Sequence, residues 1–139
     1  MKLKTLIKLL MKGFLPLSLL VAIGCGNTVA TVSGKITLDG IPLEKGDIGF
    51  HQAEGLNVST VRVNPDGSYS IGSASSTTPG NYKVVVIAND VIIGKGPGSV
   101  PMPKLITPKI YSNKETTPLK AELKAGSNVS NFDLISKSP

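Results

Sequence analysis

Apolar and polar residues alternate with a period of two at short intervals along most of the chain after residue 30. This alternation predicts β-strands that each turn one face toward a core. Turn residues separate the strands, most clearly at Asp39-Gly40 and Asn64-Pro-Asp-Gly67. The pattern predicts an all-β fold, a single seven-strand antiparallel Greek-key β-sandwich over residues 31–136. The seven predicted strands are 32–38, 47–51, 56–63, 68–71, 80–88, 117–123 and 129–135.

The inward face of most predicted strands follows from the same alternation. In the strand 80–88, Val85 and Ile87 add apolar residues on the second face, which is typical of a central strand. For 56–63 the pattern leaves open which face is inward. The expected core residues are Val32, Ile36, Leu38, Ile48, Phe50, Tyr69, Ile71, Tyr82, Val84, Val86, Ala88, Leu119, Ala121, Leu123, Phe132 and Leu134.

The segment from 94 to 108 breaks the alternation. Its sequence Gly94-Lys-Gly-Pro-Gly-Ser-Val-Pro-Met-Pro103 predicts neither a regular helix nor a regular strand, because prolines remove donors and glycines raise the cost of ordering. Irregular loops on rigid sandwiches often carry binding. The segment is therefore a candidate contact surface, and a covering loop without a partner is the alternative. The candidate contact residues are Lys95, Met102, Lys104 and Tyr111.

The first 24 residues follow a different pattern. Four lysines, at positions 2, 4, 8 and 12, precede an apolar run from Gly13 to Ile23, and small residues follow. This order is typical of a secretory signal. A transmembrane helix needs roughly 20 apolar residues. The run here is about half that long and contains Pro16, so the pattern favours export over a membrane span.

Cys25, the only cysteine, stands where such a signal would be cut. Ala22-Ile-Gly-Cys25 resembles the bacterial lipobox, with Ala22 where that motif most often has leucine. The resemblance implies a lipoprotein signal peptide over 1–24 and a lipidated N-terminus with a short linker over 25–30. Lipidation would consume the only thiol, so we expect no intramolecular disulfide.

The charge of the exported part excludes one class of partner. The whole chain carries a formal charge of +6, but four of its 15 Lys and Arg residues belong to the signal. Eleven basic residues then remain against nine acidic ones, a net charge of +2. A nucleic-acid-binding domain needs a strongly basic stripe on its folded part. We therefore expect no nucleic-acid partner.

Four turn-and-strand motifs, in order, resemble one family. They are Val32-Ser-Gly-Lys-Ile-Thr-Leu-Asp-Gly-Ile-Pro-Leu43, Gly46-Asp-Ile-Gly-Phe50, Asp66-Gly-Ser-Tyr-Ser-Ile71 and Pro79-Gly-Asn-Tyr-Lys-Val-Val-Val86. This series is similar to the carboxypeptidase regulatory-like domains, β-sandwiches related to transthyretin and to Cna B-type surface repeats. The segment 108–119 is similar to one in small lipoproteins of planctomycete-type bacteria. The resemblance implies a transthyretin-like sandwich that is a non-catalytic module.

Residues that could carry chemistry are few. His51, the only histidine, could serve a hydrolase together with Asp47, but on a strand the two residues lie about 13 Å apart. Acidic residues near turns lack the spacing of a Ca²⁺ loop, so we expect neither a metal nor a cofactor. Cna B-type domains can hold a Lys–Asn isopeptide bond, which Lys35 or Lys83 could form here with Asn131. Both lysines alternate with core residues and should face solvent, which argues against the bond.

These observations together predict a non-enzymatic, lipid-anchored β-sandwich at the bacterial cell envelope, acting as a structural or protein-interaction module. Its partners would be the membrane, through lipidated Cys25, and an envelope protein or polysaccharide. By analogy with other lipoproteins, Gly26 after the cysteine indicates outer-membrane delivery in a two-membrane cell. The alternative is a carbohydrate or small-ligand binding module, for which Tyr111 is the expected exposed aromatic. A hydrolase using His51 is a third hypothesis.

Overall fold

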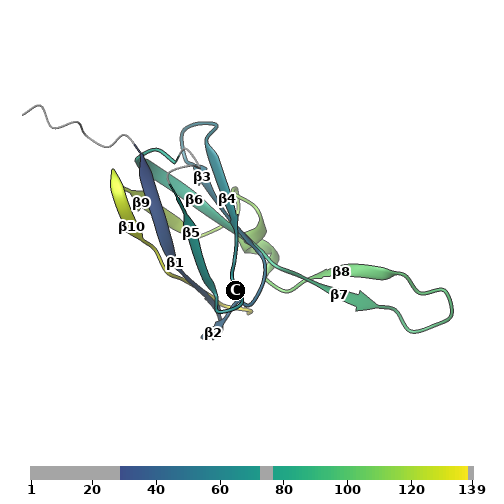
Figure 1. Cartoon of the computed structure of the whole chain (residues 1–139). Coiled ribbons are helices and arrows are strands. Elements are labelled where there is room, and N and C mark those ends of the chain that lie inside the picture. The colour runs from purple at the N-terminus through teal and green to yellow at the C-terminus, as the bar shows by residue number, and fades with distance from the viewer. Residues whose placement is uncertain (1–28, 73–76, 138–139) are drawn as a thin grey trace, which may run out of the picture.

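The computed structural model describes residues 29–72 and 77–137, and Figure 1 shows an all-β body from which a single arm extends. The predicted all-β class is confirmed. The predicted signal peptide and Cys25 lie outside the described residues. Among the residues that are described, no helix is long and apolar enough to cross a membrane.

The first sheet is built around β1 (Ala30–Leu38). On one side β1 pairs with β5 (Ser68–Ile71) and β2 (Ile41–Pro42), both antiparallel. On the other side it pairs with β10 (Gly126–Val129) and β11 (Phe132–Leu134), both parallel. The expectation of a wholly antiparallel sandwich is therefore wrong for this sheet. The first residue of β10, Gly126, lies beside the first residue of β1, Ala30, so the two strands run in the same direction.

The second sheet is antiparallel throughout. Its strand order is β4 (Val58–Arg62), β3 (Asp47–Gln52), β6 (Gly80–Ile87) and β9 (Lys120–Leu123). Central β6 is buried on both faces at Val84–Val86, so the prediction of a covered second face is confirmed for Val85, whereas Ile87, the other apolar residue of that face, is exposed. The sequence left open which face of the segment 56–63 is inward. The inward face is the one that carries Val63, because Val63 is buried whereas Val58 is exposed.

The core lies between the two sheets and contains a cluster of four aromatic rings. The ring centroid of Phe50 in β3 lies 6.0 Å from that of Tyr69 in β5 and 6.2 Å from those of Tyr82 and Phe132. These rings come from both sheets, so they join the two layers. Of the 16 expected core residues, 13 are buried, and Leu38, Leu119 and Ala121 are partly buried against the same core.

The arm in Figure 1 is a two-stranded hairpin of β7 (Asn89–Ile93) and β8 (Pro101–Leu105). After it, a short 3-10 helix, η2 (Lys109–Ser112), returns the chain to the body. The expectation that 94–103 contains no regular strand is wrong for its last residues, since Pro101 begins β8. The prolines are compatible with a strand here because β8 pairs on one side only, and an edge strand tolerates a missing donor.

Candidate functional site

The β7–β8 hairpin is the most prominent surface feature of the described residues. Every residue from Asn89 to Leu105 is exposed, although β7 and β8 consist mostly of apolar residues. An exposed apolar patch of more than a few hundred Å² marks an interaction site or a liability in a soluble protein. The large apolar side chains exposed on the hairpin are Val91, Ile92, Ile93, Val100, Met102 and Leu105.

The sequence forms this hairpin for local reasons. Val91-Ile-Ile93 is a run of β-branched residues, which favours an extended strand. The tip is closed by Ser99, which donates from its backbone N–H and its Oγ to the carbonyl of Gly96, at 3.2 and 2.8 Å. Gly96 and Gly98 have φ values of +148° and +85°, which side-chain-bearing residues rarely adopt. The glycines therefore allow the tight reversal between β7 and β8.

The base of the hairpin is fixed to the body by buried hydrogen bonds. The N–H of Ile106 donates to the carbonyl of Ala88 at 2.7 Å. The buried hydroxyl of Thr107 accepts from the N–H of Ala88 at 3.2 Å and donates to the carbonyl of Val86 at 3.3 Å. Since these bonds hold both ends of the hairpin, the arm emerges from β6 in a defined place.

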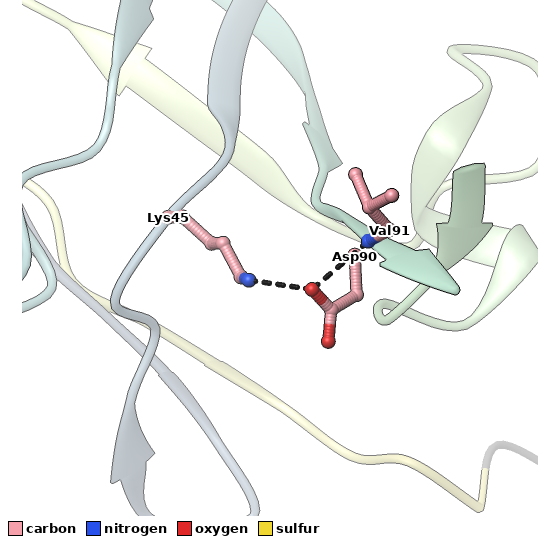
Figure 2. A network of polar contacts seen from close by, with 3 residues as sticks. All are labelled: Lys45, Asp90 and Val91. Carbon is pink, nitrogen blue, oxygen red and sulfur yellow. Dashed lines mark hydrogen bonds and ion pairs between the residues drawn. The ribbon is translucent and has the colours of Figure 1, made fainter. Parts of the chain in front are cut away.

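A second, exposed contact holds β7 from outside. Lys45 lies in the connection between β2 and β3, and its ammonium donates to Asp90 Oδ1 at 2.8 Å. Figure 2 shows this contact as a dashed line. The same oxygen accepts from the N–H of Val91 at 2.9 Å. The Lys45 hydrogen bond is the main cause that holds the pKa of Asp90 below its usual value, with help from the Val91 N–H and the charge of Lys104. Asp90 therefore stays ionised under ordinary conditions and ties Lys45 to the edge of β7.

The two faces of the hairpin differ in character. Cross-strand register pairs Asp90 with Lys104 and Ile92 with Met102, so these four side chains share one face. Val91 pairs with Pro103 and Ile93 with Pro101 on the other. The first face thus combines an opposite-charge pair with an apolar pair. The second face is apolar along most of its length, and its residues are Val91, Ile93, Pro101, Pro103 and Leu105, with Asn89 at the base.

The structure brings together three of the four predicted contact residues. Lys95 lies at the hairpin tip, and Met102 and Lys104 lie in β8. The expectation that Tyr111 is exposed is wrong, because η2 turns its ring into the core, where it is 5% exposed. Its hydroxyl accepts a hydrogen bond from the N–H of Ile135. The residues that the sequence prediction missed are those of β7, whose run of β-branched residues was the available signal.

The candidate hydrolase residues are not assembled. His51 lies in β3 opposite Val58 and Lys83, and Asp47 pairs with Arg62 at 3.6 Å instead. Partial burial, together with the charge of Lys114, lowers the pKa of His51. In the ranges 29–72 and 77–137 no group of three His, Cys, Asp or Glu residues is placed to hold a metal ion.

The residues considered for an isopeptide bond meet in a different way. Asn131 accepts a hydrogen bond through Oδ1 from the backbone N–H of Lys35, at 2.8 Å. The side chain of Lys35 is exposed, as its alternation with core residues predicted. The side-chain amide of Asn131, which lies between β10 and β11, therefore bonds to the backbone of β1.

Comparisons with known proteins add little. No protein-family model matches the chain, and no curated protein matches it. A 9R-lipoxygenase from Cyanothece PCC8801 aligns with 78% of this chain and 16% of its own length, at 12% sequence identity and a TM-score of 0.37. A superposition this loose carries no argument about fold or activity.

Proposed function

We propose that this chain is a non-enzymatic, lipid-anchored module of the bacterial cell envelope that contacts a macromolecular partner through the β7–β8 hairpin. In this proposal residues 1–24 direct export, and the thiol of Cys25 receives the lipid. The body is a transthyretin-like Greek-key sandwich of the carboxypeptidase regulatory-like kind. Delivery to the outer membrane follows in a two-membrane cell.

The observation that carries the proposal is an apolar hairpin that is exposed over both its strands and is held to the sandwich by buried hydrogen bonds at its base. Burying one exposed Val or Ile side chain contributes about 1.5–3 kcal/mol. Six such apolar side chains on one arm therefore supply enough free energy for a specific contact. A covering loop would instead pack them against the body.

The lipid would be anchored in a membrane, and the hairpin lies far enough from it to contact a partner outside that membrane. Cys25 precedes Val29 by four residues, which span at most about 14 Å. The body begins at Ala30, and β1 runs about 30 Å to Leu38. Leu38 and Ile106 line the same hollow, so the hairpin leaves the body at the end where β1 finishes. The length of the sandwich thus separates the hairpin from the lipid.

The rival hypotheses have less support in the described residues. Sugar-binding sites usually stack the sugar on an exposed aromatic ring, and the aromatic residue expected to do so, Tyr111, is in the core. In the described ranges every aromatic side chain is buried, namely Phe50, Tyr69, Tyr82, Tyr111 and Phe132. Binding of a glycan would therefore have to rely on polar side chains alone.

The lipid anchor is tested by fractionating cells that express the full chain. We expect the chain in the membrane fraction, released by detergent and not by high salt, because two acyl chains contribute about 0.8 kcal/mol per buried CH₂. The variant Cys25→Ser should remain uncleaved or unlipidated. A mature wild-type chain found in the soluble fraction would contradict the anchor.

The contact surface is tested by placing a photoreactive amino acid at Ile93 in intact cells. Leu56, which is 98% exposed in the loop before β4, is the matched control position. We expect a recurrent protein adduct from position 93 and none from position 56. Attachment to polysaccharide alone would favour the glycan-binding alternative, and equal adducts from both positions would contradict a hairpin-specific contact.

A further inference from the structure

The two edges of the hairpin are not equivalent. In β8, Pro101 and Pro103 stand opposite Ile93 and Val91. A proline has no N–H, so these residues cannot donate to β7, and their nitrogens face the outer edge. Two prolines at alternate positions therefore close the outer edge of β8 to further strand pairing.

The outer edge of β7 is built differently. The N–H of Val91 donates to its neighbour's carboxylate, Asp90 Oδ1, so it points away from β8. Backbone groups alternate in direction along a strand, so those of Asn89 and Ile93 also face outward. Apart from the Val91 N–H, which Asp90 accepts, the outward backbone groups of this edge lack a neighbouring strand, and an exposed edge of this kind is a template for another strand.

We infer that the partner of this edge is β7 of a second copy of the chain, paired antiparallel about a two-fold axis at Val91. The inference rests on the proposed role of the hairpin as contact surface and names its partner. The outward residues 89, 91 and 93 are symmetric about Val91. A two-fold axis there places Val91 opposite itself and Asn89 opposite Ile93, so each outward N–H meets a carbonyl.

The side chains fit this pairing. The two hairpins form a four-stranded sheet whose one face repeats Val91, Ile93, Pro101 and Pro103 from both copies. The pairing leaves both faces of this sheet exposed, so it buries only the facing edges of the two β7 strands and the near sides of their Val91 and Ile93 side chains. The dimer is therefore held mainly by the backbone hydrogen bonds of residues 89, 91 and 93 in both copies, with a smaller apolar contribution.

Charge and shape agree with a second copy. Asp90 is compensated by Lys45 at 2.8 Å and by Lys104 opposite it, so two hairpins approach without strong repulsion. Pairing requires the Val91 N–H to leave Asp90 for the partner's carbonyl, while Asp90 keeps Lys45. Each tip then arrives beside Asn89 of the other copy, where a hollow of about 530 Å³ opens between Ile87 and Asn89.

The first test uses the full chain in the membranes of cells that express it, with Val91→Cys. Opposed residues of an antiparallel pair have Cα atoms about 5.5 Å apart, within the range for a disulfide. The control is Val129→Cys, because Val129 is also an exposed strand valine, 74% against 65%. We expect oxidation to yield a disulfide dimer from position 91 alone. Equal dimer from both positions would overturn the inference.

The second test blocks the edge. Val91→Pro removes the outward donor, as the prolines of β8 do, and leaves the bonds between β7 and β8. Val91→Thr keeps the donor and the β-branched shape. We expect the purified full chain in detergent to sediment as a dimer in the wild type and in Val91→Thr, with loss of the dimer in Val91→Pro. The melting temperature of Val91→Pro should equal that of the wild type at a dilution where the wild type is monomeric. A monomeric wild type, or a dimer that survives Val91→Pro, would overturn the inference.

These tests separate the inference from the proposed function. If the parent chain forms a disulfide dimer by itself, Cys25 is free, which contradicts the anchor and leaves the sedimentation test to decide the pairing. If position 93 links only to a different protein in cells and the purified chain is monomeric, the contact surface stands and the second copy is excluded.

Discussion

The phenol of Tyr69 donates a 2.6 Å hydrogen bond to the backbone carbonyl of Ser130, 61 residues later in the chain. Tyr69 is buried in β5, and Ser130 lies at the join between β10 and β11. Both elements flank β1 in the first sheet. This bond therefore gives a donor to the Ser130 carbonyl, which lies in the gap between β10 and β11.

Tyr69→Phe should lower the free energy of unfolding by about 1–3 kcal/mol, because it leaves the Ser130 carbonyl without its donor while the ring still fills its place. Urea denaturation followed by circular dichroism measures the change. Ser130→Ala is the matched control, since it keeps the carbonyl, and should stay within about 0.5 kcal/mol of wild type. Equal stability of Tyr69→Phe and wild type would show that the bond contributes nothing.

Alkaline pH should remove the advantage of the wild type over Tyr69→Phe. Burial raises the pKa of Tyr69 well above that of an exposed tyrosine. A raised pKa in the folded state means that its stabilisation is complete below the unfolded value, about 10, and is lost as pH rises above it. The difference in unfolding free energy between the two proteins should shrink by up to about 1.4 kcal/mol per pH unit above pH 10. A constant difference at high pH would contradict this.

Gly34 in β1 lies against the same carbonyl. A Cβ on this residue would be 1.7 Å from the carbonyl oxygen of Ser130, which is backbone and cannot move aside cheaply. Gly34→Ala should therefore lower the free energy of unfolding by at least about 3 kcal/mol. Thermal unfolding detects this change as a lower midpoint temperature. Gly72→Ala is the control, because its Cβ would meet no atom within 4 Å. A near-neutral Gly34→Ala would show that the join between β10 and β11 adapts easily.

Much of the fold could be predicted because alternation directly reports which side chains are inward. Tyr82 and Phe50 each stand among period-two apolar residues, and both are in the core. Strand direction could not be predicted in this way, since alternation is the same in parallel and antiparallel strands. The parallel pairing of β1 with β10 depends on where the chain crosses between sheets, which no local pattern encodes.

The candidate site was predicted only in part, for two physical reasons. Pro101 and Pro103 were interpreted as strand breakers, but at alternate positions both nitrogens face one edge, where no donor is needed. Tyr111 lies in the 3-10 helix η2 that begins after Pro108, and this helix places its ring in the core. In both cases the outcome depends on which edge or turn the residue occupies, and composition does not reveal that.

Acid should loosen the hairpin base through Asp90. Its pKa is lowered chiefly by the hydrogen bond from Lys45, so its contribution is present above the usual carboxyl value and is lost as pH falls through the lower folded value. In the monomeric chain at high dilution, we expect the protection of the Val91 amide against hydrogen exchange to fall in acid, and to be low at every pH in Asp90→Asn. Asp66→Asn, in the turn before β5, is the control and should not affect Val91. Unchanged protection in Asp90→Asn would show that the carboxylate does not hold this edge.

Thr107 tests whether the buried bonds at the hairpin base hold the arm in place. Thr107→Val keeps the shape but leaves the N–H of Ala88 without its acceptor and removes the donor to Val86. We expect a loss of about 1–3 kcal/mol in unfolding free energy. Relative to the wild type, amide hydrogen exchange followed by NMR should speed up more in β7 and β8 than in β1. Thr107→Ser retains the hydroxyl and should lose less, and if it behaves like Thr107→Val, the lost methyl packing accounts for the effect.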